Sequence, residues 1–432
     1  MAAQGPRLKR DPMRLLAAAG PSDAAGGVRW LAWAQGAAIF TSSANLFSTA
    51  LANVGVLLFL LLCVPVMLGP ERRLLAWSTF PRGVAIAIVL YLGWQAIGMT
   101  YTDAPLAYAW QSFYADRKIF YILPLALVFG QEAPRRRFLQ AFLAVNAVAL
   151  ALSFGLAFPP VHTFFPKRMP TDVLHSHATQ GMAFAMACFL SLWYAKEAAS
   201  RRLRAAFALL ALLFLVNIVT ITLGRSGYLA FLVLVVAAFG IWRGVRGVTI
   251  GLAVAAVLAT TFFFVSSTVS SRVMQGVDEA DNYLAANQPR SLSVRMLLYH
   301  TTLEMIAAHP FLGTGTGSFK GNFSAIVARR YTDWKAAPFH DPHNQYLFVW
   351  VENGLPGLAS FLFLLLSLYR ACDKRTIYGQ MAAASLLAWC ATSMFSGHFR
   401  TFPEGHMIVF VLGVLMLPLQ PGDPDVRSRG LQ

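Results

Sequence analysis

Apolar stretches recur along the whole chain, and each is long enough to cross a membrane as a helix. They have roughly 18 to 22 residues, and a helix of that length spans a hydrocarbon core of about 30 Å. We count about twelve by this criterion, and the weakest, "IFYILPLALVF", is short and contains a proline. Their centres lie near Ala37, Leu60, Ile88, Pro124, Ala147, Ala187, Leu213, Leu234, Ala256, Leu364, Leu386 and Val411. The pattern predicts an all-α polytopic membrane protein with about twelve transmembrane helices.

The composition fits a membrane protein and argues against cysteine-based sites. The chain is 57% hydrophobic and only 12% charged, whereas a soluble domain has about 25% charged residues. The basic segment up to Arg29 lacks a small-residue cleavage site after a compact apolar core, so we expect no removable signal peptide. No C-x-x-C spacing occurs among the cysteines, which are Cys63, Cys188, Cys372 and Cys390. We therefore expect neither disulfides nor thiolate metal sites.

The basic residues predict how the chain is oriented in the membrane. Lys and Arg cluster in alternate connections, such as "PERRLL", "APRRRF", "AKEAASRRLR", "WRGVRG" and "ACDKR". Cytoplasmic loops carry such an excess, so these connections and the N-terminus are expected to be cytoplasmic. An even number of spans then places the C-terminus inside as well. The net charge of +16 is thus explained by orientation, and nucleic-acid binding is not expected.

This orientation divides the chain into four parts. Residues 1–268 are expected to hold transmembrane helices one to nine, with a cytoplasmic N-terminus. Residues 269–343 form a large, partly helical loop on the outer face, between spans nine and ten. Residues 344–420 hold an outer-face helix and spans ten to twelve, and residues 421–432 are a cytoplasmic tail.

The long outer loop carries two predicted helices joined by a glycine turn. The stretch "RSLSVRMLLYHTTLEMIAAHP" has apolar residues at helical spacing, with Ser291 or Ser293 as the expected N-cap and Pro310 as the stop. The following "FLGTGTGSF" is favoured as a turn, because a phosphate cradle would need a preceding strand and the P-loop lysine. A second helix is expected in "SFKGNFSAIVARRY".

Basic residues near span ends on the outer face need an explanation, because they work against the usual charge bias. Arginine offers paired donors to phosphate oxygens, so cations gathered from several spans favour a site for an anionic lipid headgroup. Snorkelling at span ends and attraction to anionic lipids are the simpler alternatives. Arg225, in the short connection "TITLGRSGYLAF", is the sharpest case. The others are Arg117, Lys118, Lys167, Arg168, His175, His177, Arg290, Arg295, His398, Arg400 and His406.

The stretch "FHDPHNQYLFVW" places a histidine where a helix is expected to begin. Asp341 is the expected N-cap and Pro342 the first helical residue. His343 then lies in the first turn, where the positive end of the helix dipole disfavours a charged imidazolium. A neutral histidine can accept a proton, so His343 is a candidate general base.

Two other interpretations of this stretch remain open. A zinc site at His340 and His343 is one alternative, but the first histidine lies before the proline and no H-E-x-x-H order follows. His343 is alternatively a capping or packing residue. In each case Asn344 and Gln345 are expected to present polar groups to the same outer vestibule.

Together these motifs resemble the O-antigen ligase and polymerase superfamily of polytopic membrane glycosyltransferases. The residues that carry the resemblance are "LGRSG" between spans, the arginine that opens the loop helix, "HPFLGTGTGSF", "HNQYL" and "ENGLPGLASF". By motif it covers roughly residues 215 to 370. It implies a GT-C-like membrane enzyme of the bacterial inner membrane whose active site faces the periplasm.

The resemblance also implies a reaction and its residues. An O-antigen ligase transfers a glycan from an undecaprenyl diphosphate carrier to the lipid A-core oligosaccharide, without a metal ion or other cofactor and with inversion. Catalytic roles fall on His343, Arg225 and Arg295, although Arg290 also lies near the start of the loop helix and leaves the second arginine open. The expected diphosphate-binding set adds Arg290, Arg117, Lys118, Arg168, His175 and His177. The expected acceptor vestibule consists of Asn344, Gln345, His340 and Arg400.

Related and unrelated functions stay open from the sequence. An O-antigen polymerase or a protein O-oligosaccharyltransferase would use the same donor chemistry with another acceptor. The protein transferases usually carry a large C-terminal extension, which is not expected here. A polyprenyl-lipid transporter is the alternative from another class, but the span interiors are nearly free of charge and show no internal repeat.

Overall fold

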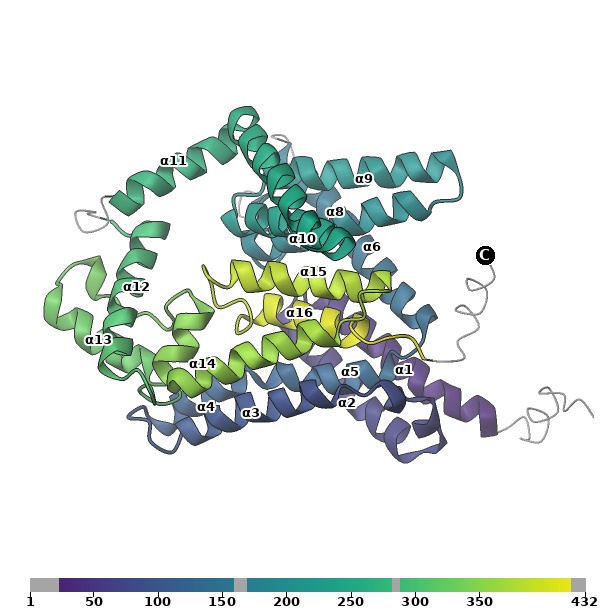
Figure 1. Cartoon of the computed structure of the whole chain (residues 1–432), viewed down its shortest axis with the longest axis horizontal. Coiled ribbons are helices and arrows are strands. Elements are labelled where there is room, and N and C mark those ends of the chain that lie inside the picture. The colour runs from purple at the N-terminus through teal and green to yellow at the C-terminus, as the bar shows by residue number, and fades with distance from the viewer. Residues whose placement is uncertain (1–22, 159–168, 282–287, 421–432) are drawn as a thin grey trace, which may run out of the picture.

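The computed structural model describes residues 23–158, 169–281 and 288–420, and within these ranges the chain is helical, without β-strands (Figure 1). The predicted all-α class is therefore confirmed. The first half contains α1 (Asp23–Ala44), α2 (Thr49–Leu68), α3 (Arg82–Gly98), α4 (Leu106–Ala115), the 3₁₀ helix η4 (Arg117–Tyr121), α5 (Ile122–Val128), α6 (Glu132–Ala157), α8 (His177–Glu197) and α9 (Arg201–Thr220). The second half contains α10 (Arg225–Val265), α11 (Ser267–Asp281), α12 (Ser291–Ala308), α13 (Phe319–Arg330), α14 (Gln345–Ala371), α15 (Ile377–Thr392) and α16 (Phe402–Leu415).

Several of these helices have the length and composition of membrane spans. Five of the described helices, namely α2, α6, α9, α10 and α14, are long and apolar enough to cross a bilayer. The shorter helices α3 and α16 are also apolar. All of the predicted span centres lie within helices, while the total of about twelve spans stays a prediction.

Helix α10 contains two of the predicted spans. Its backbone leaves helical geometry at Gly244, where φ is 60° and ψ is −141°. After this turn, Gly251 lies so close to Val236 that an added Cβ would be 2.8 Å from the Val236 Cα. The two halves of α10 therefore pack against each other as an antiparallel helical hairpin. A glycine is suited to this turn because the conformation is strained for any side chain with a Cβ.

Helices α8 and α10 touch through their backbones just after Arg225. A Cβ on Gly181 would lie 2.7 Å from the Gly227 Cα, and a Cβ on Gly227 would meet the same backbone from the other side. Only paired glycines permit this approach. The contact fixes the start of α10, and with it Arg225, against α8.

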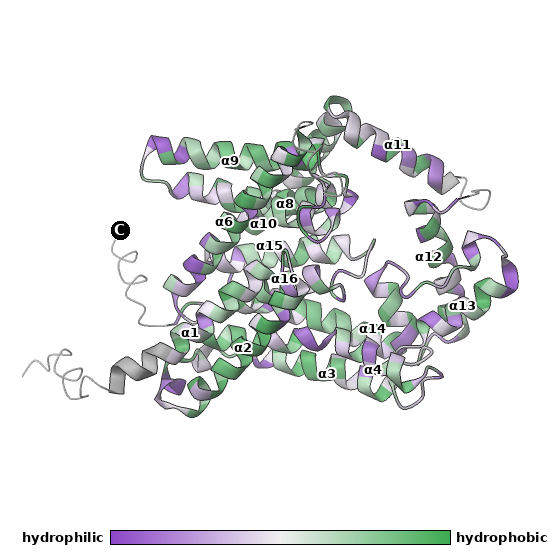
Figure 2. Cartoon of the chain, turned by 180° about the vertical axis from the view of Figure 1, so that it is seen from behind, coloured by the Kyte–Doolittle hydropathy of each residue, from purple (hydrophilic) through white to green (hydrophobic). Residues whose placement is uncertain are grey.

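A second small core lies outside the main bundle, at the end where α11, α12 and α13 project (Figure 1). It contains Leu298 of α12, Phe319 and Phe323 of α13, and Phe348 of α14. Figure 2 shows hydrophobic colour along the bundle helices and more hydrophilic colour on α11 and α13. The predicted outer loop is thus a packed helical unit joined to the first part of α14.

The start of α12 differs from the prediction. The N-cap is Arg290, which makes no side-chain capping bond, so neither Ser291 nor Ser293 has the predicted role. Instead, Oε2 of Glu279 in α11 accepts a hydrogen bond from the Leu292 amide at 2.7 Å. A buried carboxylate supplied by another helix replaces the local cap, and the sequence gives no local signal for it. The predicted stop before Pro310 and the predicted second helix, α13, are both confirmed.

The predicted glycine turn between these helices is confirmed. Gly313, Gly315 and Gly317 have φ angles of 71°, 89° and 83°. The turn packs on other elements, since the Gly315 amide donates to the Glu352 carbonyl at 2.8 Å and a Cβ on Gly317 would lie 2.6 Å from the Ala109 Cα. The same α14 segment bends at Gly354, where φ is 64°. The predicted tail, 421–432, and the first 22 residues lie outside the described ranges.

Candidate active site

The segment before α14 folds differently from the prediction. The N-cap of α14 is Asn344, whose Oδ1 accepts from the Tyr346 and Leu347 amides at 3.0 and 3.1 Å. Asp341 does not cap the helix. Its Oδ1 accepts from the His343 amide at 2.7 Å and closes a local turn around Pro342. His343 therefore precedes the helix rather than lying in its first turn, because two side chains competed for the capping role and the later one prevailed.

His343 adopts an unusual backbone conformation. Its φ is 51°, the single positive value among non-glycine residues in the described ranges. Such a conformation costs on the order of 1–3 kcal/mol and is concentrated at functional sites. Two contacts hold it: the bond to Asp341, and the Tyr299 hydroxyl, which donates to the His343 carbonyl at 3.3 Å. The same hydroxyl donates to the Met394 carbonyl at 2.7 Å, which ties His343 to the loop after α15.

The Asp341 carboxylate also holds the His343 ring. Its Oδ1 lies 3.0 Å from the His343 Nδ1. Burial would raise the pKa of the Asp341 carboxyl, but the hydrogen bonds and charge of His343 hold it below its usual value, with a further contribution from Arg400. A carboxylate at Nδ1 favours the tautomer in which Nε2 can accept a proton. The side chain of His343 is 42% exposed, so substrate can reach it.

Arg225 begins α10 and reaches across to α11. Its Nη2 donates to the Arg272 carbonyl at 2.9 Å, and its guanidinium lies over Gly276. A backbone carbonyl carries no full charge, so this contact orients the guanidinium without neutralising it. Arg225 is half-buried and remains a cation directed toward the outer-loop helices.

Arg295, on α12, lies close enough to Arg225 for the two charges to interact. Burial lowers the pKa of the Arg295 guanidinium, and the charge of Arg225 lowers it further, while Tyr299 and Glu279 act in the opposite direction. Its Nη1 donates to the Ser291 hydroxyl at 3.2 Å, whereas its buried Nε has no partner among the described residues. Two neighbouring cations with an unused donor are the arrangement that an anionic group stabilises.

The loop after α15 contributes His398, which the sequence grouped with the outer-face basic residues without giving it a separate role. His398 is 1% exposed, and neither ring nitrogen has a partner within the described ranges. Burial lowers the pKa of His398 to about 4, with Glu404 opposing and Arg295 and His343 reinforcing the effect. A neutral histidine therefore lies in the neighbourhood of both Arg295 and His343.

The other predicted diphosphate-binding residues are placed less uniformly. Lys118 is buried, and its ammonium donates to the Arg400 and Thr401 carbonyls at 2.7 and 3.1 Å. Burial lowers the pKa of Lys118 to about 7. The Arg117 guanidinium stacks 3.8 Å from the Tyr114 ring centre. Both cations thus already have contacts within the protein.

The remaining predicted diphosphate-binding residues lie near the starts of α8 and α12, and they are exposed or outside the described ranges. His177 lies beside Gly224, the residue before Arg225, because a Cβ on Gly224 would be 2.8 Å from the His177 carbonyl oxygen. His175 and Arg290 are exposed, and Arg168 lies outside the described residues.

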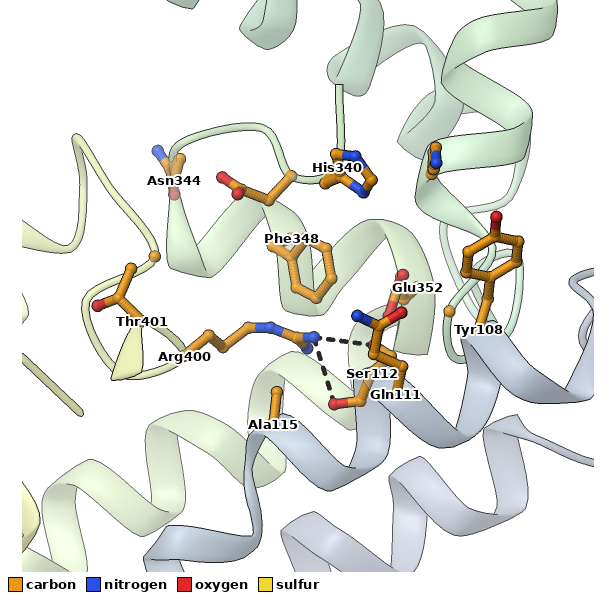
Figure 3. A pocket seen from close by; sticks show the side chains of 14 residues that line it. Tyr108, Gln111, Ser112, Ala115, His340, Asn344, Phe348, Glu352, Arg400 and Thr401 are labelled. Carbon is orange, nitrogen blue, oxygen red and sulfur yellow. Dashed lines mark hydrogen bonds between the residues drawn. The ribbon is translucent and has the colours of Figure 1, made fainter. Parts of the chain in front are cut away.

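A cavity of about 260 Å³ brings together most of the predicted acceptor vestibule (Figure 3). His340, Asn344 and Arg400 all line it, and so does Asp341. Gln345 does not line it, since its side chain is fully buried with neither amide atom paired in the described part of the chain. The cavity also includes residues that the sequence gave no reason to group, from α4, the glycine turn and α13, among them Tyr108, Gln111, Ser112, Gly317 and Lys320.

The floor of the cavity is a polar network around Arg400, whose Nη1 also lies 3.8 Å from the Asp116 Oδ2. Nη2 of Arg400 donates to the Ser112 hydroxyl at 3.0 Å, and that hydroxyl donates to Oε2 of Glu352 at 3.0 Å. Oε1 of Glu352 accepts from the Phe319 amide at 3.2 Å. Figure 3 shows Arg400 extended beneath Phe348 toward Ser112, and its guanidinium lies 4.1 Å from the Phe348 ring centre.

The zinc alternative for His340 and His343 has no third ligand in the described ranges. No group of three or more His, Cys, Asp or Glu side chains there could hold a metal ion. The described partner of His343 is instead Asp341.

Comparisons with known proteins match the region that carries these residues. The O-Antigen ligase family matches residues 210–362, which include Arg225, Arg295 and His343. The O-antigen ligase of Escherichia coli (strain K12) is 25% identical over 126 residues, covering 29% of this chain and 30% of that protein. A protein of Rickettsia felis (strain ATCC VR-1525 / URRWXCal2), named for polysaccharide ligase activity, is 33% identical over 100 residues, covering 22% of this chain and 24% of its own length.

The chain spans less than a third of the length of these curated relatives in the matched segments. The matched segment nevertheless contains the helical hairpin, the outer-loop helices and the strained histidine, which are the parts that build the candidate site. In this segment the chain is similar to the O-antigen ligase family and to two ligases of that kind.

Proposed function

We propose that this protein is an O-antigen ligase, which transfers a glycan from undecaprenyl diphosphate to the lipid A-core oligosaccharide and thereby completes lipopolysaccharide. The observation that carries the proposal is the strained His343, bound through Nδ1 to Asp341, in the same matched segment as the neighbouring Arg225 and Arg295. The family and the names of the two relatives support the reaction class.

The two arginines are proposed to bind the donor diphosphate. When the bond from the sugar's anomeric carbon to the diphosphate breaks, negative charge develops on the departing oxygen. Preorganised cations stabilise this charge most effectively where water is scarce. Arg295 offers a buried, unpaired Nε, and Arg225 is held in place by α11. The proposed helpers are His177, His175, Arg290, Arg117, Lys118 and Arg168, and His177 lies beside Gly224, which precedes Arg225.

His343 is proposed to act as the general base. The acceptor hydroxyl oxygen forms a bond to the anomeric carbon, and its proton passes to Nε2 of His343. At the same time the bond from that carbon to the diphosphate oxygen breaks, and its electron pair leaves with the diphosphate. A single displacement of this kind inverts the anomeric configuration and needs no metal ion. Asp341 is proposed as a positioning residue that orients the ring and stabilises the imidazolium.

The acceptor is proposed to approach from the side of His340, Asn344 and Arg400, which share the cavity with Asp341. We place the site at the periplasmic face of the inner membrane, with the N-terminus cytoplasmic and about twelve spans. In this arrangement residues 269–343 form the periplasmic loop, between spans one to nine within 1–268 and the outer helix and spans ten to twelve within 344–420. The predicted cytoplasmic tail is 421–432.

The test is transfer by the purified protein in EDTA, with undecaprenyl-diphosphate glycan as donor and lipid A-core as acceptor. Products are separated by size, and one glycan chain per acceptor is expected. Lengthened lipid-linked chains without use of the acceptor would instead identify a polymerase. Lipid movement across liposomes with no covalent product would identify a transporter.

Arg225→Ala and His343→Ala give the matching residue test. Loss of a charge-stabilising donor or of a base each lowers the rate by about a hundredfold or more. Arg225→Lys keeps the charge but loses the paired donors, so we expect it to retain part of the activity. Full transfer by either alanine variant would overturn the assignment.

A further inference from the structure

Two polar regions of the candidate site differ in their charge balance. Arg225 and Arg295 are close enough for their charges to interact, with Glu279 as a nearby carboxylate that already caps α12. The cavity instead contains two cations, Arg400 and Lys320, together with two carboxylates. An anionic headgroup suits the first region, whereas the second offers no surplus charge to a phosphate.

The carboxylates of the cavity are already satisfied by the protein. Glu352 accepts from the Ser112 hydroxyl and the Phe319 amide, and it lies close to the Arg400 guanidinium. Asp341 accepts from the backbone and the ring of His343. Arg400 donates twice to Ser112 through Nη2, and its Nη1 lies 3.8 Å from the Asp116 Oδ2. A ligand here meets fixed donors and acceptors of both kinds rather than one dominant charge.

A ligand with hydroxyl groups matches this lining. Each hydroxyl can both donate and accept, so the mixture of guanidinium, carboxylate and amide groups can be paired without introducing a charge. Tyr108, whose side chain is 44% exposed, and the half-buried Lys320 stem add apolar surface at the wall. The volume of about 260 Å³ lies just below the roughly 300–1,000 Å³ typical of drug-sized ligands.

We propose that this cavity is the subsite for one uncharged sugar ring of the acceptor, bound through Arg400, Asp341 and Gln111 and packed on Tyr108. The inference rests on the proposed function, and it names the chemical class that the acceptor side selects. The donor diphosphate binds at Arg225 and Arg295, so the two substrates meet at His343 from opposite sides.

Asp341 joins this subsite to the reaction. Its carboxylate lines the cavity and also holds Nδ1 of His343 at 3.0 Å. A sugar ring held against Asp341 therefore lies next to the base that must receive the proton of its hydroxyl. The arrangement lets the enzyme place an acceptor hydroxyl near Nε2 without bringing a second anion close to the diphosphate.

Competition experiments test whether the anionic and the uncharged ligand bind in different regions of the site. The purified protein is assayed with undecaprenyl-diphosphate glycan and lipid A-core, and two probes are added separately: inorganic diphosphate, and core oligosaccharide freed of lipid and phosphate. We expect diphosphate to compete with the donor and the neutral oligosaccharide to compete with the acceptor. Competition of inorganic diphosphate with the acceptor would overturn the proposal.

Variants of α4 supply the second measurement. Tyr108→Ala and Gln111→Ala are expected to raise the KM for the acceptor by about tenfold, which is the usual size of one or two lost contacts, while the KM for the donor stays unchanged. Trp110→Ala is the matched control, because Trp110 is an exposed aromatic residue of the same helix that does not line the cavity. An unchanged acceptor KM in both variants would overturn the subsite.

The outcomes separate this proposal from the function on which it rests. If Arg225→Ala abolishes transfer while the α4 variants keep the native acceptor KM, the ligase function stands and the sugar subsite is wrong. If the wild-type protein transfers no glycan to lipid A-core in the same assay, the proposed function itself fails.

Discussion

At the scale of single residues, the site depends on competition between neighbouring polar side chains. The sequence led us to choose Asp341 as the helix cap, because Asp-Pro is a common helix start. Asn344 takes that role in the structure, which leaves Asp341 free to hold His343 in its left-handed conformation. Sequence reasoning selected the right neighbourhood but could not decide between two caps three residues apart, since both make good hydrogen bonds locally.

Asp341→Asn tests the positioning role of this carboxylate. The amide can still accept from the His343 backbone, but it carries no charge to stabilise the protonated ring. We expect kcat to fall by at least about tenfold with an unchanged KM for the donor, measured by steady-state transfer. An equal loss in Asp341→Ala and Asp341→Asn, with no change in thermal unfolding, would support the charge. A wild-type kcat in Asp341→Asn would contradict it.

His398 predicts a pH dependence of stability. Burial lowers its pKa to about 4, against about 6.5 in the unfolded chain. Between these values the unfolded state binds a proton that the folded state does not, so stability falls as the pH is lowered from about 6.5 toward 4. His398→Gln removes this titration. We therefore expect its thermal unfolding temperature in detergent to fall less between pH 7 and pH 5 than that of the wild type.

His300→Gln is the control, because His300 is exposed on α12. Its difference in unfolding temperature between the two pH values should equal that of the wild type. Identical pH dependence in His398→Gln and the wild type would show that His398 is not the titrating group.

At the scale of elements, the helices were predictable from the sequence, but the hydrogen bonds between residues far apart in the sequence were not. Apolar periodicity and the glycine turn predicted that α12, α13 and α14 exist, but not the residues that cap α12 and α14. The cap of α12 comes from Glu279 in α11, and the floor of the cavity joins Ser112, Glu352 and Arg400 from three separate elements. Such contacts depend on how distant segments fold together, so no local pattern announces them.

Two glycines in neighbouring elements should respond oppositely to alanine. Gly354 has a φ of 64°, and an added Cβ would collide with the Phe311 carbonyl. Gly321 lies within α13, and a Cβ there meets nothing within 4 Å. We expect Gly354→Ala to destabilise the protein by more than about 1–2 kcal/mol, and Gly321→Ala to stabilise it by about 0.5–1 kcal/mol. Denaturant unfolding followed by tryptophan fluorescence measures both, and a neutral Gly354→Ala would contradict the strain.

At the scale of the whole molecule, the sequence predicted the class of architecture and left its details open. Apolar stretches alone located every helix that the predicted spans required, because backbone groups in a hydrocarbon core must bond within their own segment. Helix lengths were less predictable. Pro65 lies inside α2, and the two predicted spans of α10 form a hairpin that turns at Gly244 without an intervening loop. The positions of Arg225 and Arg295 were predictable individually, but their proximity required the folded loop.

The predicted orientation can be tested by cysteine labelling. Arg329 on α13 and Arg202 on α9 are both exposed, while Cys63, Cys188 and Cys372 are buried and Cys390 is partly buried. In spheroplasts we expect a membrane-impermeant maleimide to label Arg329→Cys, and Arg202→Cys to react only after lysis. The wild type gives the background. Labelling of Arg202→Cys in intact spheroplasts would contradict the orientation.

The structure of α11 sets the separation between the two proposed catalytic arginines. Arg225 contacts this fifteen-residue helix at Arg272 and Gly276. Near the other end of the helix, Glu279 accepts a hydrogen bond from the start of α12, the helix that contains Arg295. The length of α11 therefore sets the distance between the start of α10 and the start of α12. One helical turn inserted into α11 would move Arg225 and Arg295 about 5.4 Å farther apart. A single diphosphate could then no longer contact both arginines.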